Sequence, residues 1–387
     1  MTPSSGARVA PVRVGLVVGQ LGLGGAERQL FYLATGLDRG RFEPTVFCLS
    51  EQVAPYGARL EEAGVEVVAF PRHGHFDVAR VVQLGREVRR RGTRLLHAFL
   101  LDASAYAALA APLCGSPPVL ASNRVCLSER NPLRRALDRW ALGRSDAIIV
   151  NSEEVLRFTG EQYGVPASRM RRIYNGLDPR PFAAAAGDRS ARASLGAAAD
   201  DLLVVTVGRI EPQKNPGLFA DVAERVVARE PRARFAWVGT GSGAVVLESI
   251  LAGRGLGGRV RLVGSRANMP AVLGAADLHL STSDAEGLPN VVLEAMAAAL
   301  PTVATDLGGT REALGETGRL CPPGDAGALA DAVLALLGDR GEREELGCRA
   351  QERVRREFPL ERMVRETEST YDECLHRCGI PEPGAAR

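Results

Sequence analysis

The sequence predicts an α/β protein made of two doubly wound domains, each a parallel β-sheet with helices on both faces. The chain has 387 residues, which suits two domains of ordinary size better than one. Short apolar segments alternate with helical patterns along both halves, an order typical of parallel sheets. A stretch of small residues, AAAAGDRSARASLGAAAD at 183–200, separates the halves. We therefore expect two sheets rather than one.

The first half begins with an apolar strand at residues 12–18, a glycine-rich turn at 19–25 and then a helical pattern. The other elements predicted in this half are strands at 44–49, 65–70, 95–99, 118–121 and 147–150, a helix at 78–91, and an amphipathic helix before the last strand.

The second half repeats this plan. Its predicted strands are at 202–207, 234–238, 260–263, 278–281 and 301–304, and its helices are at 217–229 and from Asn290, Ala326 and Glu342. A last helix at about 360–376 follows Pro359 and is expected to cross back onto the first domain. We expect domains at 1–182 and 183–358 and a C-terminal segment at 359–387 whose tail frays after Cys378.

Composition excludes several classes of protein. With 45% hydrophobic and 24% charged residues, the chain has an ordinary globular composition. It has no run of about 18 apolar residues, and no secretory signal is seen in its first residues, so we expect a cytoplasmic protein. The seven cysteines form no CxxC pair and are expected to be free, buried thiols. His73 and His75 have no acidic or cysteine cluster beside them, which favours a surface loop over a metal site.

Charge is distributed unevenly. Up to Arg180 the chain has 24 basic and 17 acidic residues, and beyond it 24 and 29, so the first half is expected to meet an anionic partner. Nucleic acid is disfavoured because only 5% of residues are aromatic and no binding motif accompanies the charge. The segment ERNPLRRALDRWALGR at 129–144 predicts an apolar helical face beside a basic one. Core packing with a solvated basic face and contact with an anionic membrane both remain open.

Three loops carry the residues that indicate chemistry. GQLGLGGAER (19–28), VGRIEPQKN (207–215) and SDAEGLPNVVLEAM (283–296) each join a predicted strand to a predicted helix. In open α/β sheets, ligands bind at the carboxyl ends of the strands, where such loops lie. We therefore expect the binding site there.

The third loop places Glu286 and Glu294 eight residues apart at a predicted helix start, where Pro289 suits the first turn. Backbone N–H groups there favour a phosphate, and Glu294 is near enough to bind a sugar or ribose diol. Arg209 and Lys214, five residues apart in the second loop, supply the balancing positive charge. Because Lys214 is the only lysine among 48 basic residues, we expect its position to require a compact ammonium group. Together these residues predict a nucleoside diphosphate bound without a metal.

The sequence resembles the retaining glycosyltransferases of family 4, which have the two-domain GT-B fold. The resemblance covers nearly the whole chain. Its strongest carrier is the E-x7-E pattern of Glu286 and Glu294 within EGLPNVVLEAMAAALPTVATDLGG. It is supported by four further segments in order along the chain: GGAER (24–28), VNSE (150–153), YNGLDPRPF (174–182) and GRIEPQKN (208–215). The pattern alone is weak evidence, whereas all five in order are highly specific.

The resemblance implies roles for individual residues. Arg209 and Lys214 would neutralise the diphosphate of a nucleotide-sugar donor, Glu294 would bind the ribose hydroxyls, and Glu286 would hold hydroxyls of the donor sugar. The other donor-binding residues that it implies are Gly24, Gly25, Gly264, Arg266, Gly287, Leu288, Pro289 and Asn290. It implies an acceptor-side domain at 1–182 and a nucleotide-sugar-binding domain at 183–358.

One position departs from the family pattern. Many members carry a histidine after a strand of the first domain, where ASNRV places Arg124. The resemblance therefore implies no catalytic histidine at position 124. His97, at the end of a predicted strand, is the histidine placed to face the expected cleft, and a catalytic role and a hydrogen-bonded strand-end role both remain open. A phosphate oxygen of the leaving group could also receive the acceptor proton.

The expected function is therefore transfer of a sugar, with retention and without a metal or other cofactor, from a UDP- or GDP-sugar to a hydroxyl acceptor. A lipid-linked saccharide is the acceptor that membrane contact would suit, in cell-surface polysaccharide or glycolipid synthesis. The alternatives are a glycosyl phosphorylase on the same fold, a sugar-nucleotide-binding protein without turnover, and an NAD-dependent oxidoreductase.

Overall fold

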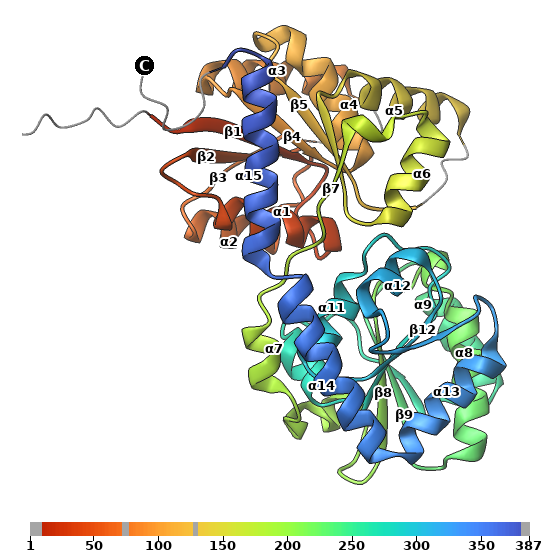
Figure 1. The fold of residues 1–387 in the computed structure, drawn as a ribbon. Helices are drawn as coiled ribbons and strands as arrows, with labels where there is room; N and C mark the ends of the chain where they lie inside the picture. Colours follow the sequence, from red (N-terminus) through yellow and green to blue (C-terminus); the bar gives the residue numbers. More distant parts are fainter. Residues whose placement is uncertain (1–9, 72–76, 127–130, 381–387) are drawn as a thin grey trace, which may run out of the picture. The chain divides into compact units, whose positions relative to one another are not determined.

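The computed structural model describes residues 10–71, 77–126 and 131–380. Contacts divide the chain into two units, which Figure 1 shows: the first comprises Met1–Gly176 and Leu360–Arg387, and the second comprises Leu177–Pro359. Each unit is a parallel sheet with helices, so the predicted α/β class with two doubly wound sheets is confirmed. The expected loop at His73 and His75, the N-terminal residues and the tail at 381–387 lie outside the described residues.

The sheet of the first unit has seven strands in the order β3-β2-β1-β4-β5-β6-β7, and all neighbouring pairs are parallel. The strands are β1 Val12–Val18, β2 Phe42–Cys48, β3 Glu66–Ala69, β4 Leu95–Phe99, β5 Val119–Asn123, β6 Ala147–Val150 and β7 Met170–Arg172. The helices are α1 Gly25–Gly36, α2 Tyr56–Glu62, α3 Val78–Arg91, α4 Leu100–Ala110, α5 Pro132–Arg144, α6 Glu153–Tyr163 and α15 Leu360–Arg377.

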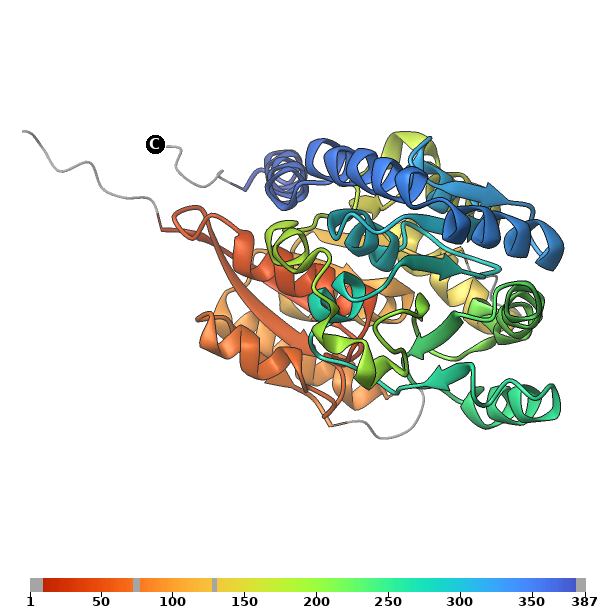
Figure 2. The ribbon, with the colours of Figure 1, turned by 90° about the horizontal axis from the view of Figure 1, so that it is seen from below.

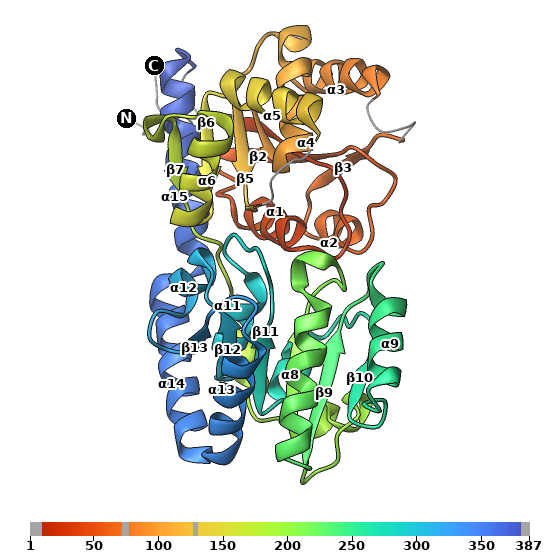
Figure 3. The same cartoon turned by 90° about the vertical axis from the view of Figure 1, so that its right-hand side faces the viewer.

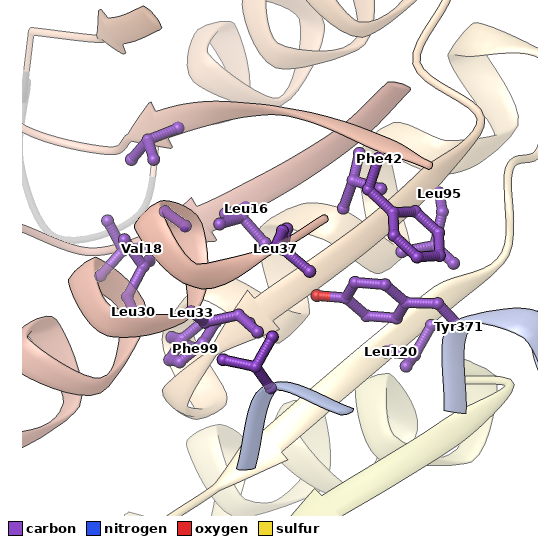
Figure 4. Packing of buried hydrophobic residues seen from close by; sticks show 14 of the residues in the cluster. Leu16, Val18, Leu30, Leu33, Leu37, Phe42, Leu95, Phe99, Leu120 and Tyr371 are labelled. Carbon is purple, nitrogen blue, oxygen red and sulfur yellow. The ribbon is translucent and has the colours of Figure 1, made fainter. Parts of the chain in front are cut away.

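Strand β1 shows how this sheet forms two cores. Successive side chains of a strand point to opposite faces. Leu16 therefore packs in the cluster that contains α1 and α15, whereas Val17 packs in the cluster that contains α3 and α4. Figure 4 shows the first cluster, in which Tyr371 of α15 lies among Phe42, Leu95 and Leu120. The last helix thus completes the core of a sheet whose strands all precede residue 177.

Polar contacts also hold α15 on the first unit. Arg41 pairs with Glu368 at 3.4 Å and with Asp372 at 2.6 Å. Figure 2 views α15 nearly along its axis, in the same unit as β1. Just before the chain leaves this unit, the side chain of Gln29 accepts a hydrogen bond from the N–H of Gly176 at 3.0 Å and donates one to its carbonyl at 2.9 Å. Both contacts tie late segments of the chain to its beginning.

The sheet of the second unit has six strands in the order β10-β9-β8-β11-β12-β13, again all parallel (Figure 3). The strands are β8 Leu202–Val207, β9 Ala233–Val238, β10 Val260–Leu262, β11 Leu278–Ser281, β12 Thr302–Thr305 and β13 Arg319–Cys321. The helices are α7 Arg180–Ala185, α8 Pro216–Arg229, α9 Ala244–Gly253, α10 Met269–Gly274, α11 Asn290–Ala297, α12 Gly308–Leu314, α13 Ala326–Gly338 and α14 Arg340–Glu357. Trp237 of β9 packs edge-on against Phe219 of α8, with ring centroids 4.8 Å apart.

All seven cysteines are free thiols, as expected from their spacing. The expectation that they are all buried is wrong, because Cys348 in α14 and Cys378, which follows α15, are exposed. Across the described ranges, no helix combines the length and the apolar character needed to span a bilayer.

Candidate functional site

The candidate site lies at the carboxyl edge of the second sheet, where three glycines follow neighbouring strands. The N–H of Gly208 donates to the carbonyl of Val238 at 3.0 Å, and the N–H of Gly239 donates to the carbonyl of Gly264 at 3.0 Å. A Cβ on Gly239 would lie 2.0 Å from the carbonyl oxygen of Gly208. Only glycine allows these turns to approach so closely, so the loops after β8, β9 and β10 form one backbone platform.

Hydrogen bonds join the loop after β8 to the loop after β11. The side chain of Gln213 donates through Nε2 to the carbonyl of Ala285 at 2.7 Å. The backbone carbonyl of Gln213 accepts a hydrogen bond from the N–H of Asp284 at 2.8 Å. The hydroxyl of Thr282 donates to the carbonyl of Lys214 at 2.9 Å. The two loops that carry Lys214 and Glu286 are therefore held in register.

Lys214 and Glu286 form an ion pair at the centre of these loops. Ser283 donates a hydrogen bond to the same carboxylate oxygen of Glu286 at 2.7 Å. The lysine stem packs over Gly208, because a Cβ there would lie 3.0 Å from the Lys214 Cε atom. Both side chains are largely buried, with 19% and 10% exposed, so the pair is oriented before any ligand arrives.

The other two predicted cations are exposed. Arg209 follows β8 by two residues, and no described residue forms an ion pair or side-chain hydrogen bond with its guanidinium. Its charge lowers the pKa of Glu211, after the larger effect of hydrogen bonds from Ser242. Arg266 lies two residues after Gly264, which has a left-handed φ of 68°, and among the described residues its side chain donates only to the carbonyl of Ser265 at 3.3 Å. Arg209 and Arg266 are thus accessible to an anion from solvent.

The EGLPN loop leads into α11, whose first residue is Asn290 as predicted. Pro289 occupies the cap position before the helix rather than its first turn. Gly287, Leu288 and Pro289 are buried, and Glu294 is 1% exposed in the helix. Gly309 supports the loop from behind, since a Cβ on it would lie 1.3 Å from the carbonyl oxygen of Gly287. The structure therefore brings the predicted residues from 208 to 294 to one edge of one sheet.

Gly24, Gly25 and His97 belong to the first unit instead. Gly24 is the N-terminal cap of α1 and Gly25 is its first residue. His97 is fully buried in β4, where Nδ1 lies 2.7 Å from the hydroxyl of Tyr371 and Nε2 lies 2.8 Å from the hydroxyl of Ser122. Burial, with a smaller effect of the Arg124 charge, lowers the pKa of His97 to about 3. This environment favours the hydrogen-bonded strand interpretation of His97 over the catalytic one.

Acid is expected to destabilise the protein through two buried histidines. His279 in β11 is also fully buried, and burial, with a smaller effect of Lys214, lowers its pKa to about 3. Between pH 6.5 and 3 the unfolded chain binds protons at both positions while the folded chain does not. Each histidine therefore lowers the free energy of unfolding by about 1.4 kcal/mol for every unit by which the pH falls in this range. Urea unfolding at pH 7 and pH 5 measures this. The His279→Gln variant should show a shallower pH dependence, and His376→Gln, at an exposed position, should match the unmodified protein.

Sequence reasoning missed Gln213 and Ser283, which fix the two loops. Gln213 precedes the lone lysine and Ser283 precedes Glu286 by three residues, but nothing in that spacing indicates a contact between segments about 70 residues apart. It also missed a cavity of about 570 Å³ in the first unit, between α3, α4 and α5. Its lining residues are Gly19, Leu49, Arg80, Asp102, Ala105, Tyr106, Asn131, Leu133, Arg134, Leu137 and Asp138.

Two family profiles match the chain. The profile described as Glycosyltransferase Family 4 matches residues 23–180, and the profile described as Glycosyl transferases group 1 matches residues 201–339. Together they span most of the chain.

Curated relatives agree with the profiles. The N-acetyl-alpha-D-glucosaminyl L-malate synthase of Bacillus anthracis is 24% identical over 307 residues, which are 78% of this chain and 80% of the relative. The D-inositol 3-phosphate glycosyltransferase of Nocardia farcinica is 33% identical over 232 residues, 57% of this chain. The match spans only 51% of that second relative.

Solved structures match almost the entire chain. Anabaena Alr3699/HepE, in a crystal structure with UDP-glucose, has a TM-score of 0.81 and 21% identity, with 93% of this chain and 99% of that chain covered. Sucrose-phosphate synthase from Thermosynechococcus elongatus has a TM-score of 0.77 and 20% identity, with 95% and 100% covered. At these identities the likeness concerns the fold. With both profiles matched, the chain belongs to the family 4 glycosyltransferases and has the GT-B fold.

Proposed function

We propose that this glycosyltransferase takes its sugar from a UDP-sugar and transfers it, with retention and without a metal, to a hydroxyl acceptor. The observation that carries the donor proposal is the Lys214–Glu286 pair, held by Ser283 at the edge where Arg209 is exposed. A diphosphate needs cations, and a sugar needs carboxylate acceptors for its hydroxyls. The pair places one of each at a single point. The HepE structure with UDP-glucose supports uridine as the base.

Charge at the leaving group is the main chemical demand of this reaction. When the bond from the sugar to the phosphate breaks, negative charge grows on the diphosphate. In the proposal, Lys214 and Arg209 stabilise that charge, which is the task a divalent cation performs in other sites. Glu286 orients Lys214 and holds hydroxyls of the sugar, and Glu294 binds the ribose. Retention of configuration is proposed from the resemblance to the retaining family.

A screen of ligands tests the donor. The purified protein is heated with UDP-, GDP- and ADP-sugars in the presence of EDTA, with NAD as a control, and hydrolysis is followed in parallel. A ligand at 100 times its dissociation constant adds about 2.7 kcal/mol of stability. We expect stabilisation and slow hydrolysis with UDP-sugars alone. Stabilisation that disappears in EDTA would contradict metal independence, and stabilisation without any turnover would favour a binding protein.

The acceptor side is proposed to be a lipid-linked saccharide, in synthesis of cell-surface polysaccharide or glycolipid. The supporting observation is that Leu133 and Trp140 of α5 are 81% and 41% exposed. These two residues are seven positions apart and therefore lie on the same face of the helix. Four arginines of the same helix are also exposed: Arg134, Arg135, Arg139 and Arg144. Exposed aromatic and aliphatic side chains flanked by arginines favour contact with an anionic bilayer over complete core packing. Such contact would place the protein at the inner face of the cell membrane.

Vesicle binding should depend on these two side chains. The double variant Leu133→Ser, Trp140→Ser is expected to co-sediment with phosphatidylglycerol vesicles at least about tenfold less than the unmodified protein, because burial of both side chains contributes about 3–5 kcal/mol. Val245→Ser, which removes an apolar side chain 75% exposed on α9, is the matched control and should bind as before. Equal sedimentation of all three proteins would contradict the membrane proposal. Binding to phosphatidylcholine vesicles should be weak throughout.

A phosphorylase on the same fold remains the second candidate. It would use inorganic phosphate as the acceptor or release it as a product. Measurement of phosphate during turnover separates it from a transferase, for which phosphate should be neither consumed nor formed.

A further inference from the structure

Arg124 is a buried cation, and no carboxylate among the residues that the structure describes balances its charge. This residue directly follows β5 and is 7% exposed. Nη1 donates to Oδ1 of Asn175 at 2.7 Å, and the guanidinium carbon lies over the Phe99 ring, 5.1 Å from its centroid. Within the described ranges, none of its contacts is with an acidic group. Burial lowers the pKa of Arg124 to about 10, so the group is still charged at neutral pH.

In the described part of the chain two other arginines are buried, and both have acidic partners. Arg192 donates to Asp277 at 2.9 Å, and Nε of Arg80 lies 3.8 Å from a carboxylate oxygen of Asp77. A buried charge is costly unless it is paired, because it loses its hydration without compensation. A folded chain that keeps such a charge needs a reason other than stability, and binding of an external anion supplies one.

The surroundings of Arg124 are polar and lie at a sheet edge. Asn151 follows β6 directly, Asn175 follows β7 by three residues, and both amides are buried, at 2% and 3% exposed. Asn151 donates through Nδ2 to the carbonyl of Arg124 at 3.4 Å. Three neighbouring strands of a parallel sheet therefore place an arginine and two amides at their carboxyl ends, the position where open α/β sheets bind ligands.

Two buried atoms in this cluster have no hydrogen-bond partner among the described residues. They are Nε of Arg124, a donor, and Oδ1 of Asn151, an acceptor. Leaving such atoms unsatisfied costs free energy in each case. A ligand that offers an anionic oxygen to Nε and a hydroxyl to Oδ1 would satisfy both. Hydrogen phosphate carries both groups on one atom, and a sugar phosphate or a hydroxy acid carries them nearby.

We propose that Arg124, Asn151 and Asn175 form an anion-binding site in the first unit that takes a phosphate or carboxylate group. The site is distinct from the Lys214–Glu286 pair, which belongs to the second unit. The existence of the site does not depend on the proposed function. The identity of the anion does rest on the proposed function, because the two sources considered are the diphosphate of the donor and an acidic group on the acceptor.

Binding of simple anions to the full-length protein tests the site. Isothermal titration with inorganic phosphate, pyrophosphate, UDP and uridine compares the unmodified protein with Arg124→Gln, Arg124→Lys, Asn151→Ala and Lys214→Gln. We expect Arg124→Gln to weaken phosphate binding about tenfold or more, Arg124→Lys to retain part of it, and Asn151→Ala to weaken it less. Arg139→Gln removes an exposed arginine of the same unit and controls for overall charge.

The melting temperature without ligand gives a second readout. Because Arg124→Gln removes an uncompensated buried charge, its melting temperature should equal or exceed that of the unmodified protein, whereas a purely structural arginine would lower it. Should Arg124→Gln be unfolded, this expectation fails and Arg124 is a structural residue. Equal phosphate and pyrophosphate affinities in all variants, or no binding by the unmodified protein at millimolar concentrations, would also overturn the proposal.

The pattern across probes identifies the source of the anion. If Arg124→Gln weakens UDP binding and spares uridine, the site takes the diphosphate of the donor. If it weakens phosphate binding and spares UDP, the site takes an acidic group of the acceptor. Lys214→Gln separates this result from the proposed function: unchanged UDP affinity in that variant would refute the donor site in the second unit and leave the Arg124 site standing.

Discussion

Lys214→Ala is expected to lower turnover of the UDP-sugar about 10²–10³-fold, the loss typical of removing one preorganised donor from a developing negative charge. The substitution also leaves the carboxylate of Glu286, 9% exposed, with Ser283 as its remaining hydrogen-bond partner. Steady-state kinetics with a fixed UDP-sugar measures the effect. Lys214→Arg should recover only part of the activity, because a planar guanidinium does not fit where an ammonium packs over Gly208.

A matched control removes a different, exposed side chain of the second unit. Cys348→Ser on α14 should have the turnover and melting temperature of the unmodified protein. Glu294→Ala should weaken UDP-sugar binding as well, in keeping with its proposed role at the ribose. If Lys214→Ala and Glu294→Ala both had the kinetics of the unmodified protein, the site in the second unit would be refuted.

Gly309→Ala is expected to destroy the proposed donor site by displacing the EGLPN loop (286–290). The new Cβ would lie 1.3 Å from the carbonyl oxygen of Gly287, so either α12 or the EGLPN loop must move. Such overpacking costs about 1–3 kcal/mol or more, and a displacement of one ångström at this loop is enough to lose a phosphate or sugar contact. Calorimetry and UDP titration should show a lower melting temperature and loss of UDP binding.

Gly253→Ala is the control for this prediction. Gly253 lies in α9, and a Cβ there would meet no atom within 4 Å. Alanine favours a helix over glycine by about 1 kcal/mol, so this variant should be slightly more stable and bind UDP normally. If Gly309→Ala also bound UDP normally, the buried backbone contact behind the loop would have no role in the site.

The fold was predictable wherever local chemistry marks both ends of an element. Helix α3 begins and ends where the sequence predicts, because Asp77 caps it by accepting from Ala79 N–H and Gly92 ends it in a left-handed conformation. Strands β7 and β13 were not predicted. Each has three residues, Met170–Arg172 and Arg319–Cys321, lies at a sheet edge and contains arginine, so neither shows an apolar run.

The candidate site was predictable as a set of residues but not as a set of contacts. The spacing of Glu286 and Glu294 and the lone Lys214 indicated the nucleotide chemistry. That Lys214 pairs with Glu286 could not be deduced, because the contact depends on how β8 and β11 lie side by side in the sheet. The same limit applies to His97, whose surroundings include Tyr371 from the far end of the chain.

The placement of α15 has a consequence for synthesis of the protein. The second unit is one uninterrupted segment, Leu177–Pro359, and all of it is translated before α15. The first unit, although most of it is translated first, lacks Tyr371 and the partners of Arg41 until α15 emerges. The nascent chain is therefore expected to complete the second unit before the first, and the apolar face of the first sheet that α15 covers stays open to chaperones or to misassociation until α15 emerges.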